Sequence, residues 1–147
     1  MNTNHLHYIG YIGPIIMIYL TILYFYIFDI PKIKYFIKWL VLTGIINTIL
    51  KHIIKSKRPN NEKPFVLFNR IKLDNYGMPS GHAQYAAFIL LFFAYYATDY
   101  KLLILFLYSF ISILTLYQRY YFRAHSGLQV ITGVLVGIIE GFIERIL

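Results

Sequence analysis

The sequence contains no cysteine and few charged residues, and each scarcity excludes a class of protein. Without cysteine the chain can form no disulfide, no thiolate metal site and no thiol nucleophile. Charged residues make up 14% of the 147 residues, whereas 59% are hydrophobic. A soluble domain of this size needs a largely polar surface, which this composition cannot supply. We therefore expect residues 1–147 to form a single integral-membrane domain.

Long apolar runs separate the polar stretches, and each is close to the roughly 20 residues of a spanning helix. Backbone groups in lipid must be satisfied within the segment, and no alternating strand pattern occurs, so helices are indicated. The first run lacks a basic start and a small-residue cleavage site, so we expect a retained helix. The prediction is an all-α, polytopic membrane helix bundle with about five transmembrane helices. The helices are expected near residues 8–28, 35–57, 81–98, 101–120 and 126–145.

Basic residues exceed acidic ones, which gives a net charge of +8. A basic cluster beside a membrane typically meets anionic headgroups, so membrane lipids are expected partners. Nucleic-acid binding requires a soluble basic face, and no nucleic-acid partner is expected. Half of the 14 basic residues lie between positions 51 and 72, namely Lys51, Lys55, Lys57, Arg58, Lys63, Arg70 and Lys72.

If five helices span the membrane, three polar segments fall on one side of it. The first is KHIIKSKRP, which closes the second helix. Lys51 and Arg58 are seven residues apart and would share a helix face, with Pro59 ending the helix. Such cations either hold an anion or extend to the interface.

The second segment is PSGH, which opens the third helix. Backbone N–H groups from Gly81 onward, at the positive end of the helix dipole, would face an anion. His82 lies in the first turn, where it either exchanges a proton or serves as a polar cap.

The third segment is QRYYFRAHSGLQV, between the fourth and fifth helices. If one helix stops after Arg119 and the next begins near Ser126, then Arg119 and His125 can point into one site. Gln129 follows His125 by four residues, and we expect it to hydrogen-bond the imidazole.

Beyond this segment the fifth helix carries glycines at every fourth position. Gly133, Gly137 and Gly141 predict a small-residue strip for close helix packing. Glu140 and Glu144 lie toward the other side, and we interpret them as interface or partner-pairing residues.

In order and internal spacing, the three segments resemble the motifs of the phosphatidic-acid phosphatase type 2 superfamily. Lys51 with Arg58-Pro59 matches the first motif and Pro79-Ser80-Gly81-His82 the second. Arg119 and His125 match the third, although Gln118 replaces its serine and Gln129 its aspartate.

Three features are similar to the dolichyl-diphosphate phosphatase branch of that superfamily: Gln129, Gln84 and Gly77-Met78-Pro79. The superfamily core usually has six spanning helices, so one before the first motif is missing here.

The resemblance implies a phosphatase that needs neither metal nor cofactor. Its phosphate would be bound by Lys51, Arg58 and Arg119 and by backbone N–H groups around Ser80 and Gly81. His125 would attack phosphorus, His82 would protonate the leaving oxygen, and Gln129 would orient His125.

The expected substrate is a lipid diphosphate of the polyprenyl or dolichyl type. A diphosphate expels a weaker base than an alkoxide, which suits a nucleophile without an aspartate partner. A lipid monophosphate phosphatase, acting on phosphatidic acid or phosphatidylglycerol phosphate, and a degenerate membrane scaffold remain alternatives. The distribution of basic residues between the two sides does not decide which side of the membrane the site faces. The resemblance favours a lumenal or extracytoplasmic site, in the endoplasmic reticulum membrane if the source is eukaryotic or viral.

Overall fold

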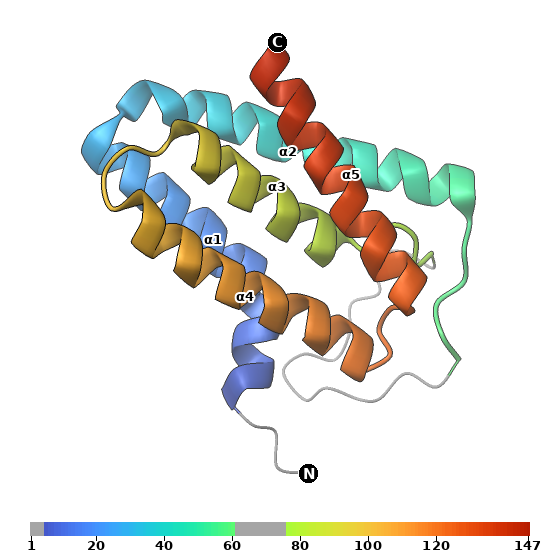
Figure 1. Cartoon of the computed structure of the whole chain (residues 1–147). Coiled ribbons are helices and arrows are strands. Elements are labelled where there is room, and N and C mark those ends of the chain that lie inside the picture. Colours follow the sequence, from blue (N-terminus) through green and yellow to red (C-terminus); the bar gives the residue numbers. More distant parts are fainter. Residues whose placement is uncertain (1–4, 61–75) are drawn as a thin grey trace.

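The computed structural model describes residues 5–60 and 76–147, which form a bundle of five helices (Figure 1). Its all-α architecture confirms the fold class predicted from the sequence. The expected headgroup contacts of Lys63, Arg70 and Lys72 lie outside the described residues. The helices are α1 (His5–Phe28), α2 (Ile30–Ile54), α3 (Gly81–Tyr96), α4 (Lys101–Tyr121) and α5 (Gly127–Ile146).

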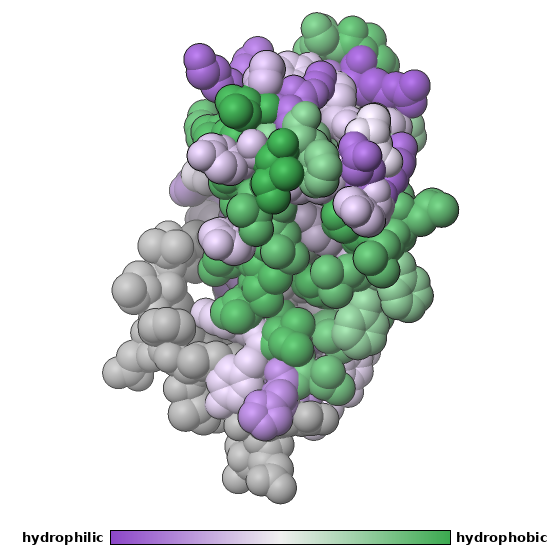
Figure 2. Space-filling model, turned by 90° about the vertical axis from the view of Figure 1, so that its left-hand side faces the viewer, coloured by the Kyte–Doolittle hydropathy of each residue, from purple (hydrophilic) through white to green (hydrophobic). Residues whose placement is uncertain are grey.

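Four of these helices, α1, α2, α4 and α5, are long and apolar enough to cross a membrane. Many of their large apolar side chains face outward at helical spacing, for example Val41, Ile45, Ile49 and Ile53 on α2. Figure 2 shows a mostly hydrophobic middle on one face of the molecule, with hydrophilic residues gathered at its upper end. Side chains of this kind are stable facing lipid rather than water, as expected for an integral membrane protein.

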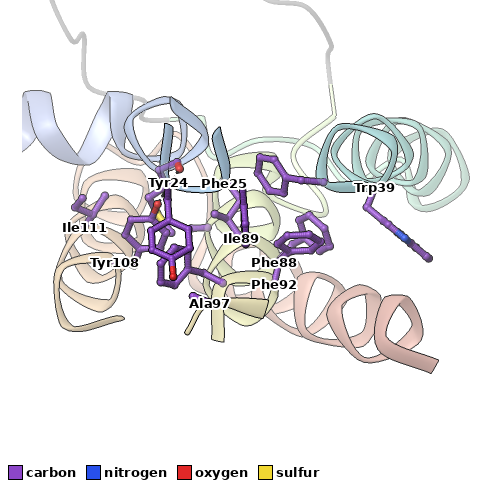
Figure 3. Close-up of a cluster of buried hydrophobic side chains, with 13 residues drawn as sticks. Tyr24, Phe25, Trp39, Phe88, Ile89, Phe92, Ala97, Tyr108 and Ile111 are labelled. Carbon is purple, nitrogen blue, oxygen red and sulfur yellow. Dashed lines mark hydrogen bonds between the residues drawn. The ribbon is translucent and has the colours of Figure 1, made fainter. Parts of the chain in front are cut away.

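Helix α3 is shorter, with 16 residues, and packs against all four other helices. Its buried aromatic residues meet those of α1 and α4 in the centre of the bundle. Figure 3 shows Tyr24 and Phe25 of α1, Phe92 of α3 and Tyr108 of α4 gathered in this core. The rings of Tyr24, Phe25 and Tyr108 approach Phe93, which is fully buried, in tilted and edge-to-face arrangements, and Phe92 packs edge-to-face on Phe25. The aromatic core thereby fixes α3 relative to the rest of the bundle.

The glycines of α5 allow it to lie directly on α3. A Cβ at Gly133 would come within 2.5 Å of the Ser80 carbonyl oxygen, and one at Gly137 would collide with the Gln84 carbonyl oxygen. At Gly141 it would lie 3.0 Å from Leu91 Cβ. The predicted small-residue packing strip is therefore confirmed. It brings the start of α5 against the start of α3.

Helix α2 differs from its predicted bounds at both ends. It begins at Ile30, five residues before the expected start, because Pro31 is well placed in a first turn, where its missing N–H costs no hydrogen bond. It ends at Ile54, since Lys55 adopts a left-handed conformation with φ 50°. The next residues pair with the segment before α3, where the Gly77 N–H donates to the Ser56 carbonyl at 2.7 Å.

That early end corrects one expectation about the site. Arg58 lies outside the helix, so the prediction that Lys51 and Arg58 share a helix face is wrong. The other helices begin and end within three residues of their predicted bounds.

Candidate active site

The three polar segments that were expected on one side of the membrane meet at one end of the bundle. Arg58 Nη1 lies 3.5 Å from His125 Nε2, and Arg119 Nη1 lies 3.4 Å from His82 Nε2. Lys51 is close enough for its charge to act on His125. The side chains of Lys51 and Arg119 are each only 7% exposed. Three cations and two histidines, contributed by residues from α2 to the start of α5, therefore converge on one site.

The hydrogen bonds of His125 show which of its two ring nitrogens carries the hydrogen. Nδ1 lies 2.8 Å from the Gly77 carbonyl oxygen. A carbonyl oxygen only accepts, so Nδ1 must carry the hydrogen, and the lone pair is on Nε2, which faces Arg58. Burial lowers the pKa of His125 to about 3, assisted by the positive charges of Arg58, Arg119 and Lys51. At neutral pH His125 is therefore an uncharged imidazole with an available Nε2.

Gln129 makes a different set of hydrogen bonds from the one predicted. Its Nε2 donates to Ser56 Oγ at 3.1 Å and to the Lys57 carbonyl at 2.8 Å. Its Oε1 accepts from the Ser126 N–H, in a capping box at the start of α5. Both amide hydrogens are thus engaged, and the expected hydrogen bond to the His125 imidazole is replaced by the one to Gly77. Since His125 precedes the helix, a spacing of four residues does not place it one turn from Gln129.

Gly77 is the site residue whose role the sequence analysis missed. A Cβ at this position would lie 2.5 Å from Gln129 Nε2, so a larger residue would displace the Gln129 amide or the Gly77 backbone. Gln129 thus packs against the residue whose carbonyl accepts from His125. The S-x-x-Q pattern of Ser126–Gln129 is a capping-box signal in the sequence that would have indicated these partners for Gln129.

The PSGH turn presents its polar groups at the N-terminus of α3. The Ser80 N–H donates to the Gln129 carbonyl at 3.0 Å, so it is already engaged. Of the backbone donors expected here, the Ser80 N–H is therefore excluded. The first-turn N–H groups from Gly81 onward stay available, because the Ser80 side chain does not cap them. The Ser80 hydroxyl is buried and has no hydrogen-bond partner among the described residues. These groups lie at a helix N-terminus, where the helix dipole favours negative charge.

Arg119 is held in place by two neighbours. Its Nε donates to Gln118 Oε1 at 2.8 Å, and its guanidinium lies 5.0 Å from the centre of the Tyr11 ring. The same ring lies 5.8 Å from the His82 imidazole. Helix α1 therefore supplies Tyr11 as an aromatic support for both Arg119 and His82.

A model of one protein family, the PAP2 superfamily, matches residues 32–144 of the chain, a range that contains all of these site residues except Tyr11. The chain belongs to the PAP2 superfamily. Members of this superfamily are phosphatases, and membership indicates lipid-type phosphate substrates. Neither the search of curated proteins nor the search of solved structures found a match.

The PAP2 site has space beside its nucleophile candidate. A pocket of about 440 Å³ is lined by His125 and Arg123, together with three tyrosines of α4. One of them, Tyr121, stacks on His7 with ring centres 5.2 Å apart. Within residues 5–60 and 76–147, His and acidic side chains form no group of three that could hold a metal ion. The charged group of the pocket lining is Arg123, whereas Lys51, Arg58 and Arg119 lie around the two histidines.

Proposed function

We propose that this PAP2 protein hydrolyses a lipid diphosphate of the polyprenyl or dolichyl type through a phosphohistidine at His125. The observation that carries the proposal is the hydrogen bond from His125 Nδ1 to the Gly77 carbonyl. It leaves Nε2 unprotonated beside a group of cations, which is the state a nucleophile needs.

Phosphoryl transfer depends on positioning and on cations that bind the nonbridging oxygens. Lys51, Arg58 and Arg119 would bind these oxygens, with the Ser80 hydroxyl and the N–H groups from Gly81 onward. His125 Nε2 then forms a bond to phosphorus while the bond to the leaving oxygen breaks.

His82 would donate a proton to the leaving oxygen and afterwards accept one from water. That water attacks phosphorus, the bond to Nε2 breaks, and inorganic phosphate leaves. The protons balance over the two steps, and no oxidant or reductant is needed. With three cations at the phosphate, we expect activity to need no metal ion.

The partner of His125 supports a diphosphate substrate. A neutral carbonyl fixes the tautomer but provides no negative charge to stabilise the imidazolium that forms during attack. A diphosphate expels a phosphate monoester, a much weaker base than the alkoxide released from a monophosphate. The less activated nucleophile therefore suits the better leaving group. We further propose that the site faces the lumen or the outside of the cell.

Phosphate release from purified protein in detergent tests this proposal. The panel contains prenyl diphosphates, the corresponding monophosphates, phosphatidic acid and phosphatidylglycerol phosphate, each with and without EDTA. We expect prenyl diphosphates to give the highest kcat/KM, EDTA to have no effect, and rapid quenching to trap phosphohistidine in wild type but not in His125→Gln. Faster release from phosphatidic acid would establish the monophosphatase instead, and no release from any substrate would establish a scaffold.

A further inference from the structure

A chain of buried hydrogen bonds connects α5, α3 and α2 and ends at the PSGH turn. Gln84 Nε2 donates to Glu140 Oε1 at 2.7 Å and to the Thr43 carbonyl at 3.2 Å. Asn47 Nδ2 donates to Gln84 Oε1 at 2.7 Å and to the Pro79 carbonyl at 3.3 Å. Gln84, Glu140 and Asn47 are 0%, 3% and 7% exposed. Of the two alternatives expected for Glu140, an interface position is excluded because α5 turns it toward α3, and pairing with another side chain is observed.

Gln84 is the centre of this chain because its oxygen and nitrogen are both engaged. Gln84 donates to one carboxyl oxygen of Glu140, and the Thr43 side chain lies close enough to this carboxyl to interact with it as well. Polar groups inside a membrane bundle are costly unless paired, whereas apolar side chains could fill the same space without that cost. The presence of these buried hydrogen-bonded side chains therefore indicates a role in addition to packing.

This series of hydrogen bonds ends at the PSGH turn, which carries the proposed phosphate-binding groups. Asn47 bonds the carbonyl of Pro79, and its Oδ1 would lie 3.4 Å from a Cβ at Gly81. From the opposite side, the Gln129 carbonyl accepts from the Ser80 N–H at 3.0 Å. The turn is thus held between α2 and α5. Asn47 also lies one helical turn before Lys51, so the same face of α2 carries both residues.

We propose that Asn47, Gln84 and Glu140 are positioning residues that hold the N-terminal end of α3 in the geometry that binds phosphate. They do not touch the phosphate. Glu140 orients the Gln84 amide, Gln84 orients Asn47, and Asn47 fixes the Pro79 carbonyl, which sets the Ser80 hydroxyl and the N–H groups of the first turn. The inference rests on the proposed phosphate site, and it holds whichever lipid phosphate that site accepts.

Binding of vanadate, an analogue of five-coordinate phosphorus, tests the inference without knowledge of the substrate. Asn47→Leu keeps the branched shape and the number of heavy atoms but removes the donor to Pro79 and Gln84. We expect it to weaken vanadate binding by roughly the 10–100-fold that is typical of losing an orienting contact. Thr21→Val is the matched control, because it removes a buried hydrogen bond of 2.8 Å to Tyr108, between α1 and α4. This control should lower the thermal midpoint while vanadate binds as in wild type.

A charge-exchange pair tests the link between Gln84 and Glu140. Gln84→Glu places an acceptor against the Glu140 carboxyl, and Glu140→Gln supplies a donor to replace the one lost. We expect Gln84→Glu to bind vanadate more weakly, Glu140→Gln to bind it nearly as wild type because its amide oxygen still accepts from Gln84, and the double variant to recover at least part of the Gln84→Glu loss. A purely structural role would not give this recovery in affinity.

The inference is overturned if Asn47→Leu lowers the thermal midpoint as Thr21→Val does but binds vanadate within twofold of wild type. It is also overturned if the double variant binds no better than the weaker single variant. Wild type that binds vanadate but releases no phosphate from any lipid contradicts the proposed function and leaves the positioning role standing. Wild type that does not bind vanadate overturns both.

Discussion

At the residue scale, the chemistry depends on how a single imidazole is held. The Gly77 carbonyl selects the His125 tautomer, and burial together with Arg58 keeps the ring uncharged. Arg58 also donates to the Ala124 carbonyl at 3.2 Å, so it is fixed to the segment that carries His125. His125 and Arg58 are therefore positioned by the same few contacts.

The first prediction concerns the protonation of His125. Its pKa is lowered from the usual 6.5 to about 3, so the neutral ring persists as pH falls through the normal range of histidine. In the phosphate-free protein, NMR of the imidazole should show no titration of His125 between about pH 5 and pH 8. The signal is assigned by its loss in His125→Gln. A midpoint near 6.5 would contradict the account of the site.

The second prediction concerns Gly77. Gly77→Ala places a methyl group against the Gln129 amide, so the Gln129 side chain or the Gly77 backbone that bonds His125 must shift. We expect kcat to fall by roughly 10–100-fold, as for other orienting contacts, with a smaller change in KM. Gly127→Ala is a matched control, since its methyl group would lie 3.7 Å from the Tyr120 ring, an ordinary contact. Equal kcat values for the two variants would show that the Gly77 carbonyl does not orient the nucleophile.

At the element scale, α3 and α5 form the frame of the site. The glycine strip brings the two helices into close contact, and it sets the start of α5 beside the PSGH turn. The capping box of Ser126 and Gln129 begins α5 at Gly127, which leaves His125 in the preceding loop. The early end of α2 has a similar effect, because it frees Arg58 to reach that loop.

The third prediction tests this packing. Gly137→Ala brings a methyl group against the Gln84 backbone and Ala87, so α5 must move away from α3. Overpacking of this kind costs about 1–3 kcal/mol of unfolding free energy, measured by denaturant titration in detergent. Leu135→Ala, at a position 54% exposed on the outer face of α5, is the control and should have a smaller effect. The reverse order would indicate that the strip does not pack tightly.

At the scale of the whole molecule, the bundle has two distinct ends. The start of α1 lies at the site end, where His7 stacks on Tyr121 of α4. The end of α5 lies at the other end, where Tyr35 of α2 donates to the Glu144 carbonyl at 2.9 Å. Glu144 is fully buried there, so of its two expected roles the interface position is excluded and the pairing role is the one that fits its neighbours Tyr35 and Tyr96. The outer ends of the first and last helices therefore lie at opposite ends of the bundle (Figure 1).

The fourth prediction uses the absence of cysteine. In vesicles of defined orientation, Leu6→Cys and Leu147→Cys should react with a membrane-impermeant maleimide from opposite sides. Both positions are exposed, at 43% and 86%. Thr98→Cys, in the exposed link between α3 and α4, should label from the same side as Leu147→Cys. Labelling of positions 6 and 147 from one side would contradict the arrangement of the five helices.

The sequence by itself determined the helices and the side on which their polar ends gather. An apolar run can be recognised as a lipid-facing helix from its own residues alone. Counting the helices then places Lys51, His82 and His125 at the same end of the bundle. The tertiary structure alone decided which groups these residues touch. His125 and Gly77 are 48 residues apart, and Gln84 and Glu140 are 56 apart. Periodicity carries no information over such separations, because these hydrogen bonds depend on where α2 stops and on how closely α5 approaches α3.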